Sequence, residues 1–159
     1  MTHAHGGNNM NAEDMLGQSI LADVRAACSL DSNDNSFDQQ LIPLINSQLM
    51  MAHQFGVGVD GFILWGTGET WRDFLGEDGN RLAAVSTWLG YSVKLLFDPP
   101  DNGTVLKSYQ DQIAKMEWML SSKSQTTGIV KQYVTEKQAA IYDDLFEYED
   151  SQEEDEEGL

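Results

Sequence analysis

Two short segments carry residue types that bind ligands in many proteins. Residues 56–61 read Gly-Val-Gly-Val-Asp-Gly, which matches the letters of a dinucleotide-binding loop. Such a loop follows a strand and opens a helix, whereas this segment follows helical spacing, so a glycine-rich turn is favoured. Residues 31–35 begin like a calcium-binding loop, but Ser36 replaces the sixth-position glycine and Ile42 replaces the twelfth-position glutamate. We interpret this second segment as a turn between helices.

Histidine and cysteine are few and widely separated in the chain. The sequence has three histidines, His3, His5 and His53, and a single cysteine, Cys28, whereas a structural metal site uses about four such ligands. Cys28 belongs to an apolar helical stripe, where cysteine is more often a small buried residue than a nucleophile. The sequence has neither a Gly-x-Ser-x-Gly elbow nor a Gly-Lys-Ser/Thr loop. It therefore predicts no enzyme, no metal site and no cofactor.

Acidic residues dominate the charge of this chain of 159 residues. It has 26 Asp and Glu against 9 Lys and Arg, with a formal net charge of -17 and a pI near 4.2. Repulsion between carboxylates and phosphates excludes a simple nucleic-acid-binding surface. Hydrophobic residues make up 41% of the chain, but no apolar run reaches the roughly 18 residues of a membrane span. The first ten residues lack a secretory pattern, so we expect a soluble chain that folds in the cytosol.

Four stretches of the sequence have apolar residues at steps of three and four, as in amphipathic helices. They cover residues 16–28, 41–55, 82–96 and 105–120. This pattern predicts a mainly α fold, a small four-helix bundle. Trp88 and Trp118 lie within two of the stretches, where a place in the core is favoured over an interface.

Local signals mark the ends of the predicted helices. Gly56 can take the left-handed conformation that stops the second helix, two consecutive prolines stop the third, and Thr104 can cap the fourth. The start of the second helix has two interpretations. Residues 36–39 resemble a capping box, but Pro43 would then lie inside the helix and remove a hydrogen bond. Either the helix kinks at Pro43 or it begins near Ile42.

The segment 56–79 is rich in glycine and aromatic residues, and we expect a long structured loop. It contains seven glycines and an apolar run at 62–65 that could pair as an irregular hairpin. Long loops in compact domains are usually functional or docked, and tryptophan is enriched in binding hot spots. An interface and a core position are equally compatible with Trp65 and Trp71. The candidate interface residues of this segment are Phe62, Trp65, Trp71 and Phe74.

The ends of the chain differ in composition from its centre. We predict a flexible N-terminal arm over residues 1–12, a helical core over 13–121 and a C-terminal docking arm over 122–159. Residues 143–159 contain 10 acidic residues and no basic one, and within them 151–158 have no apolar residue to bury, which predicts that 151–158 form a disordered acidic tail. The apolar residues upstream of that tail suit docking on another protein better than a spacer role. The candidate interface residues of this arm are Tyr133, Ile141 and Phe146.

Several stretches resemble one protein family in their residues and their order. They are Leu-Ile-Pro-Leu-Ile-Asn-Ser-Gln-Leu at 41–49, Gly-Val-Gly-Val-Asp-Gly-Phe at 56–62, Glu-Thr-Trp-Arg-Asp-Phe-Leu at 69–75, Lys-Leu-Leu-Phe-Asp-Pro-Pro at 94–100 and Ile-Ala-Lys-Met-Glu-Trp-Met-Leu at 113–120. The chain resembles small head-tail connector proteins, the head-completion or adaptor proteins of tailed bacteriophages. The resemblance covers about residues 16–120, and Pro43 departs from its usual pattern.

The resemblance implies a structural virion protein without an active site. Such a protein would form a homo-oligomeric ring, with twelve copies expected, at the neck of the particle after assembly in the host cytoplasm. The ring would attach below the portal protein, receive a tail-side stopper or tail-completion protein, and let genomic DNA pass without specific binding or membrane contact. Carboxylates that face the channel would repel the DNA phosphates during ejection.

A protein of another class also fits the total charge. An acidic DNA mimic or regulator would bind a host protein on its DNA-binding surface. Mimics spread carboxylates over the folded body, whereas 10 of the 26 acidic residues here lie in the last 17 residues. This distribution favours the connector.

Overall fold

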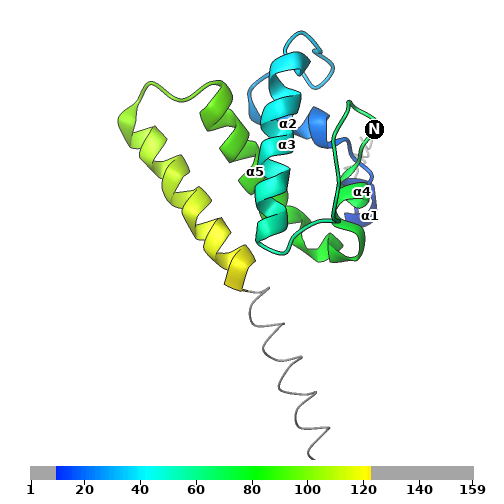
Figure 1. Cartoon of the computed structure of the whole chain (residues 1–159). Helices are drawn as coiled ribbons and strands as arrows, with labels where there is room; N and C mark the ends of the chain where they lie inside the picture. Colours follow the sequence, from blue (N-terminus) through cyan, green and yellow to red (C-terminus); the bar gives the residue numbers. More distant parts are fainter. Residues whose placement is uncertain (1–9, 123–159) are drawn as a thin grey trace, which may run out of the picture. The chain divides into compact units, whose positions relative to one another are not determined.

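The computed structural model describes residues 10–122, and most of them are helical (Figure 1). Within this range no residue belongs to a β-strand, and an isolated antiparallel bridge joins Ser19 and Thr70. The prediction of a mainly α fold is confirmed. The hairpin considered for residues 62–65 does not form.

The described range contains short and long helices. They are α1 (Ala12–Leu16), α2 (Ile20–Ala27), α3 (Asp38–Gln54), α4 (Trp71–Leu75), the 3-10 helix η1 (Gly76–Arg81) and α5 (Leu82–Phe97). A further helix begins at residue 103 and continues to the end of the described range; we call it the 103–122 helix. It corresponds, together with α2, α3 and α5, to the four predicted amphipathic stretches.

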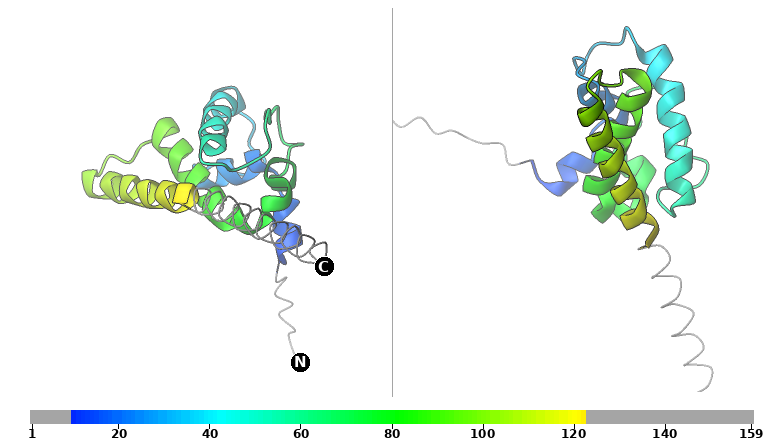
Figure 2. Two further views of the ribbon diagram at one scale, coloured as in Figure 1. Left: turned by 60° about the horizontal axis from the view of Figure 1, so that its bottom comes forward. Right: turned by 90° about the vertical axis from the view of Figure 1, so that its left-hand side faces the viewer.

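α5 is the central helix of the bundle. α2 and α3 pack against it, and the 103–122 helix lies along another side, as Figures 1 and 2 show from different directions. The apolar stripes meet in one core, whose largest members are shielded from water. They include Ile20, Leu21, Leu41, Ile45, Trp88 and Leu89. Full burial of each such side chain stabilises the folded chain by roughly 1.5–3 kcal/mol. The helices therefore pack in the arrangement that brings their apolar stripes together.

Aromatic contacts hold the 103–122 helix against α5. The rings of Tyr91 and Tyr109 meet edge to face with their centroids 4.8 Å apart. The indole Nε1 of Trp88 donates a hydrogen bond to Oε1 of Glu117 at 3.2 Å, and Leu120 is buried. The predicted core position of Trp88 is therefore confirmed. Of the predicted stripe 105–120, Leu120 is buried and Ile113 and Met116 pack partly buried against the core, whereas Val105 at its start is exposed.

The first predicted stripe is broken into α1 and α2. The break occurs because backbone groups near it bond to another segment: Ile20 N–H donates to the Glu69 carbonyl at 3.2 Å, and Trp71 N–H donates to the Gln18 carbonyl at 3.1 Å. The hydroxyl of Ser19 then caps α2 by accepting from the N–H of Ala22. A single helix through this region was a wrong expectation, since tertiary pairing overrides the periodicity.

α3 begins at Asp38 and continues through Pro43. Its N-cap residue, Phe37, makes no side-chain capping bond, so the capping box expected at residues 36–39 does not form. The helix therefore starts before the proline and not near Ile42. Gly56 has φ +78° just beyond the end of the helix, and its expected role as a left-handed stop is confirmed.

The starts of two other helices correct the sequence interpretation. The 103–122 helix is capped by Asn102, whose Oδ1 accepts from the N–H of Thr104 at 2.9 Å, so Thr104 is not the cap. The segment 56–79, expected to be a loop throughout, contains α4 and most of η1. α4 begins with a capping box in which the hydroxyl of Thr70 and the carboxylate of Asp73 each accept from the other residue's backbone N–H.

Gly58 has a steric reason to be glycine. It has φ +88°, and a Cβ atom added there would lie 2.2 Å from the ring of Phe74. We expect Gly58→Ala to lower the free energy of unfolding by more than the roughly 1–3 kcal/mol of backbone strain alone. Gly61→Ala is the matched control, because Gly61 has φ +73° and nothing within 4 Å of such a Cβ. Urea denaturation of both variants measures the difference, and equal losses would contradict the steric argument.

Candidate docking surface

Residues 62–65 form an extended segment whose side chains alternate between the core and the solvent. Phe62 and Leu64 point inward: Leu64 is fully buried, and the ring of Phe62 lies 5.2 Å from that of Phe74. Ile63 and Trp65 point outward, and Trp65 is 76% exposed. An indole this exposed contributes little to the fold of the single chain, which makes it a candidate anchor for a partner.

The backbone that carries Trp65 is fixed by two side chains. The amide of Asn46 on α3 donates to the Leu64 carbonyl at 2.9 Å and accepts from the Leu64 N–H at 2.8 Å. The carboxylate of Glu69 accepts from the N–H groups of Trp65 at 3.2 Å and Gly66 at 3.0 Å. The segment is ordered before any partner binds, so binding through Trp65 loses less conformational entropy.

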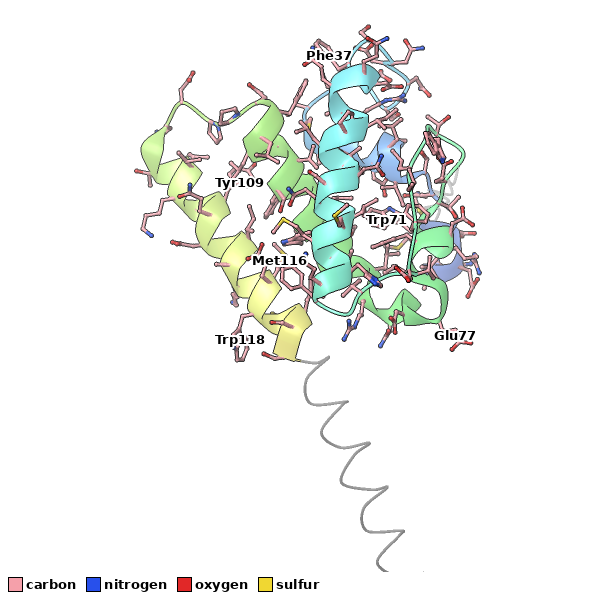
Figure 3. The ribbon with its side chains drawn as sticks, viewed as in Figure 1. Phe37, Trp71, Glu77, Tyr109, Met116 and Trp118 are labelled. Carbon is pink, nitrogen blue, oxygen red and sulfur yellow. The ribbon has the colours of Figure 1, made fainter. Side chains whose placement is uncertain are left out.

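The predicted interface residues of this region separate into different environments. Trp65 lies on the surface, and Phe62 is half-buried. Trp71 and Phe74 are each only 1% exposed, and Figure 3 shows Trp71 turned toward the interior of the chain. Of the two positions left open for Trp71, the structure shows the core, and the candidate interface residue Phe74 is buried as well, because α4 directs both rings into the core.

Trp71 also makes a polar contact inside the fold. Its indole Nε1 donates to Oδ2 of Asp23 on α2 at 2.6 Å. Burial raises the pKa of the Asp23 carboxyl above its ordinary value, and the hydrogen bond from Trp71 offsets part of that rise. At the start of α4, hydrogen bonds from the backbone N–H and the hydroxyl of Thr70 lower the pKa of Asp73. These carboxylates position α4 and the aromatic segment before it.

Trp118 lies on the surface, which corrects the expectation of a core position. It is 70% exposed, and in Figure 3 its side chain points away from the bundle, whereas Met116 points toward it. The reason is angular: a residue two positions from Met116 or from Leu120 is turned by about 200° around the helix axis. A helical wheel of residues 105–120 would have placed Trp118 on the face opposite the apolar stripe.

The remaining interface residues, Tyr133, Ile141 and Phe146, lie outside the described residues. So do the proposed N-terminal arm up to residue 9 and the acidic tail. Asn46 and Glu69 were not recognised from the sequence. Asn46 is 18 residues away from the backbone group it binds, and no local pattern marks a contact of that range.

A comparison with known protein families identifies the chain. A family described as phage connector protein matches residues 20–127, about two thirds of the sequence. The chain belongs to the phage connector protein family. No curated protein and no solved structure gives a significant match. Membership gives the chain a structural role in joining the phage head to the tail, at the neck of the virion and in association with other head-tail components.

The described part of this connector shows no cluster of metal ligands. Among residues 10–122, no three His, Cys, Asp or Glu side chains come together as metal ligands. In the former calcium-loop candidate, Asp31 and Asp34 each accept a backbone N–H two residues ahead, which makes tight turns. No helix in the same range is both long and apolar enough to cross a membrane.

A shallow hollow lies between α5 and the start of the 103–122 helix. Its volume is about 330 Å³, and Tyr91, Val105, Ser108, Tyr109 and Gln112 are among its lining residues. Hydroxyl and amide groups rim the Tyr91–Tyr109 ring pair, and no carboxylate belongs to the lining.

Proposed function

We propose that this connector forms a homo-oligomeric ring of twelve copies that binds the portal protein on the head side and a stopper or tail-completion protein on the tail side. The observation that carries the proposal is Trp65, an indole 76% exposed on a segment fixed from both sides by Asn46 and Glu69. Rigid, exposed aromatic anchors are the typical hot spots of protein interfaces. Family membership indicates that the chain acts at the neck of the virion, and Trp65 is the residue through which we propose that it binds a partner.

The experiment that tests the proposal replaces Trp65. Phage heads that lack this chain are mixed with purified full-length chain and then with tails, and joined particles are counted by infectivity. We expect Trp65→Ala to lower joining at least tenfold, since loss of a hot spot costs about 2 kcal/mol or more. Its thermal stability should stay near that of the wild type, because truncation of a side chain on the surface changes stability by about 0.5 kcal/mol or less.

Thr67→Ala is the matched control for Trp65→Ala. Thr67 is exposed and lies two residues further along the same segment, so its truncation tests whether any change in this loop disturbs joining. We expect joining with this variant to stay within twofold of the wild type. Full joining by Trp65→Ala at wild-type protein concentration would contradict the proposal.

The proposed ring would carry genomic DNA through its centre. Residues 10–122 contain 15 Asp and Glu and six Lys and Arg, and an acidic wall repels phosphates, so DNA would slide without being bound. The C-terminal arm, with Tyr133, Ile141 and Phe146, would dock on the portal or on a neighbouring subunit. Imaging of the assembled neck tests both points: a basic channel wall, or an arm that contacts neither protein, would contradict them.

A further inference from the structure

The outward face of α3 has no charged side chains. From residue 39 to residue 59 the sequence has no Asp, Glu, Lys or Arg, the longest such run in the chain. One side of α3 faces the solvent along its length, and Met50 on that side is 70% exposed. The exposed residues of α3 are Gln39, Gln40, Pro43, Ser47, Met50, Met51, His53 and Gln54. We call this set the neutral face of α3.

A solvent-exposed helix face normally carries charges. The 103–122 helix follows this rule, since Lys107 and Asp111 form an exposed ion pair at 3.0 Å and Lys115 is also exposed. α3 is as accessible, but its exposed side chains are amides, a hydroxyl, a proline, thioethers and one imidazole, that of His53, which lies 3.5 Å from the carboxylate of Asp60 beyond the end of the helix. Depletion of charge and enrichment of methionine are features of the buried centre of protein interfaces.

We propose that the neutral face of α3 is a contact surface for a second copy of this chain. The partner is identified by charge. Each copy carries a net charge of -17, so two copies repel wherever their acidic surfaces approach each other. A basic partner would gain most from the acidic surfaces, whereas an equally acidic partner gains most from the surface where carboxylates are absent. The neutral face therefore fits another copy better than a partner of opposite charge.

The size of the neutral face sets the expected strength of the contact. α3 has 17 residues, so it is about 25 Å long, and a face roughly 10 Å wide offers about 250 Å². A stable interface needs about 800 Å² from each partner. The segment with Trp65 lies alongside α3, joined to it through Asn46, and can extend the contact. Self-association of the purified chain should thus be weak and become strong only when a ring closes.

The proposal rests on the proposed ring, and a position-specific cross-link tests it separately. A benzophenone is attached to the full-length chain at Met50→Cys, or at Gln110→Cys as the control, with Cys28→Ser in both. Gln110 is exposed on the 103–122 helix. The labelled chains are irradiated in concentrated solution and after binding to heads. We expect position 50 to give a product of twice the mass of the 17.7 kDa chain, at least fivefold more than position 110.

Charge variants give a second measurement. Ser47→Glu with Met50→Glu adds two charges to the neutral face, and Gln110→Glu with Ala114→Glu adds two charges to the exposed side of the 103–122 helix. Each charge pair is placed in unlabelled chains, which are mixed with chains that carry the benzophenone at position 50. Compared with unlabelled wild-type chains, we expect the first pair to lower the yield of dimer cross-linked between labelled and unlabelled chains at least tenfold and the second pair to lower it less than twofold. Circular dichroism and thermal melts verify that both variants are folded.

The outcomes separate this inference from the proposed function. A cross-link from position 50 to a different head protein, no dimer in either setting, or equal effects of the two charge pairs would overturn the neutral face as a contact between copies. Heads that never retain the chain would instead overturn the proposed ring at the portal. A dimer formed through position 50 in solution would support the inference even in that case.

Discussion

Replacement of Trp71 by alanine is expected to lower the free energy of unfolding by about 3–5 kcal/mol, as for other buried aromatic side chains. Trp71 is 1% exposed and joins α4 to α2 through the 2.6 Å bond from Nε1 to Asp23. The alanine variant loses the packing of the indole and the only hydrogen bond described for that carboxylate. A domain of this size has about 5–15 kcal/mol in total, so a large part of the variant should be unfolded near 37 °C.

Trp71→Phe separates the hydrogen bond from the packing. Phenylalanine keeps an aromatic ring in the core but cannot donate to Asp23, so we expect a smaller loss, about 1–3 kcal/mol for the unsatisfied carboxylate together with reduced packing. Urea denaturation monitored by far-UV circular dichroism measures both variants. Equal stability of Trp71→Ala and the wild type would show that α4 does not depend on this ring.

The pH dependence of the same variants tests the role of Asp23. Its pKa in the folded chain lies above the ordinary value of 3.8 because of burial. Between 3.8 and the raised pKa the folded state binds more protons than the unfolded state, so this group lowers the free energy of unfolding as pH rises through that window. Loss of the Trp71 hydrogen bond raises the pKa further, so Trp71→Phe should extend the window to higher pH. Asp23→Asn should abolish this contribution.

Arg25→Met is expected to destabilise the chain by about 3 kcal/mol, at the lower end of the range for breaking a buried ion pair. The guanidinium of Arg25, 3% exposed, donates to both carboxylate oxygens of Asp38 at 2.9 and 2.6 Å and to the Ser32 carbonyl at 2.7 Å. Methionine would fill similar volume but leave Asp38 without its partner at the start of α3. The side chain of Asp38 is 22% exposed, so water reduces the penalty.

A double-mutant cycle isolates the pair. Asp38→Asn alone leaves the Arg25 charge buried, whereas Arg25→Met with Asp38→Asn removes both charges. We expect the double variant to be more stable than the sum of the two single losses predicts. Additive losses, measured by denaturant titration at pH 7, would show that Arg25 and Asp38 do not act as a pair.

The features that could be predicted from the sequence are those set by residues only a few positions apart in the chain. The four main helices follow from apolar residues three and four positions apart, and the end of α3 follows from the ability of Gly56 to take positive φ. The start of α4 also had a local signal, the capping pair Thr70 and Asp73. That pair was missed because glycine-rich composition suggested a continuous loop.

Features that depend on contacts between distant segments could not be read from the sequence. Backbone pairing of residues 18–20 with 69–71 breaks the first stripe into two helices, and the same pairing directs Trp71 inward. Trp65 and Trp71 stand in similar sequence surroundings, yet one is on the surface and the other is in the core. Their difference comes from α4 and from Asn46, neither of which was expected.

The hydrogen bonds around Leu64 have a consequence for the behaviour of the chain at high concentration. Residues 62–65, Phe-Ile-Leu-Trp, are an uncharged apolar run of the kind that seeds amyloid-like stacking when its backbone is free. The N–H groups of three consecutive residues, Leu64, Trp65 and Gly66, already donate to Asn46 and Glu69. An incoming strand finds no free donors at these three residues, so the exposed indole of Trp65 can be displayed while pairing along this part of the run is hindered.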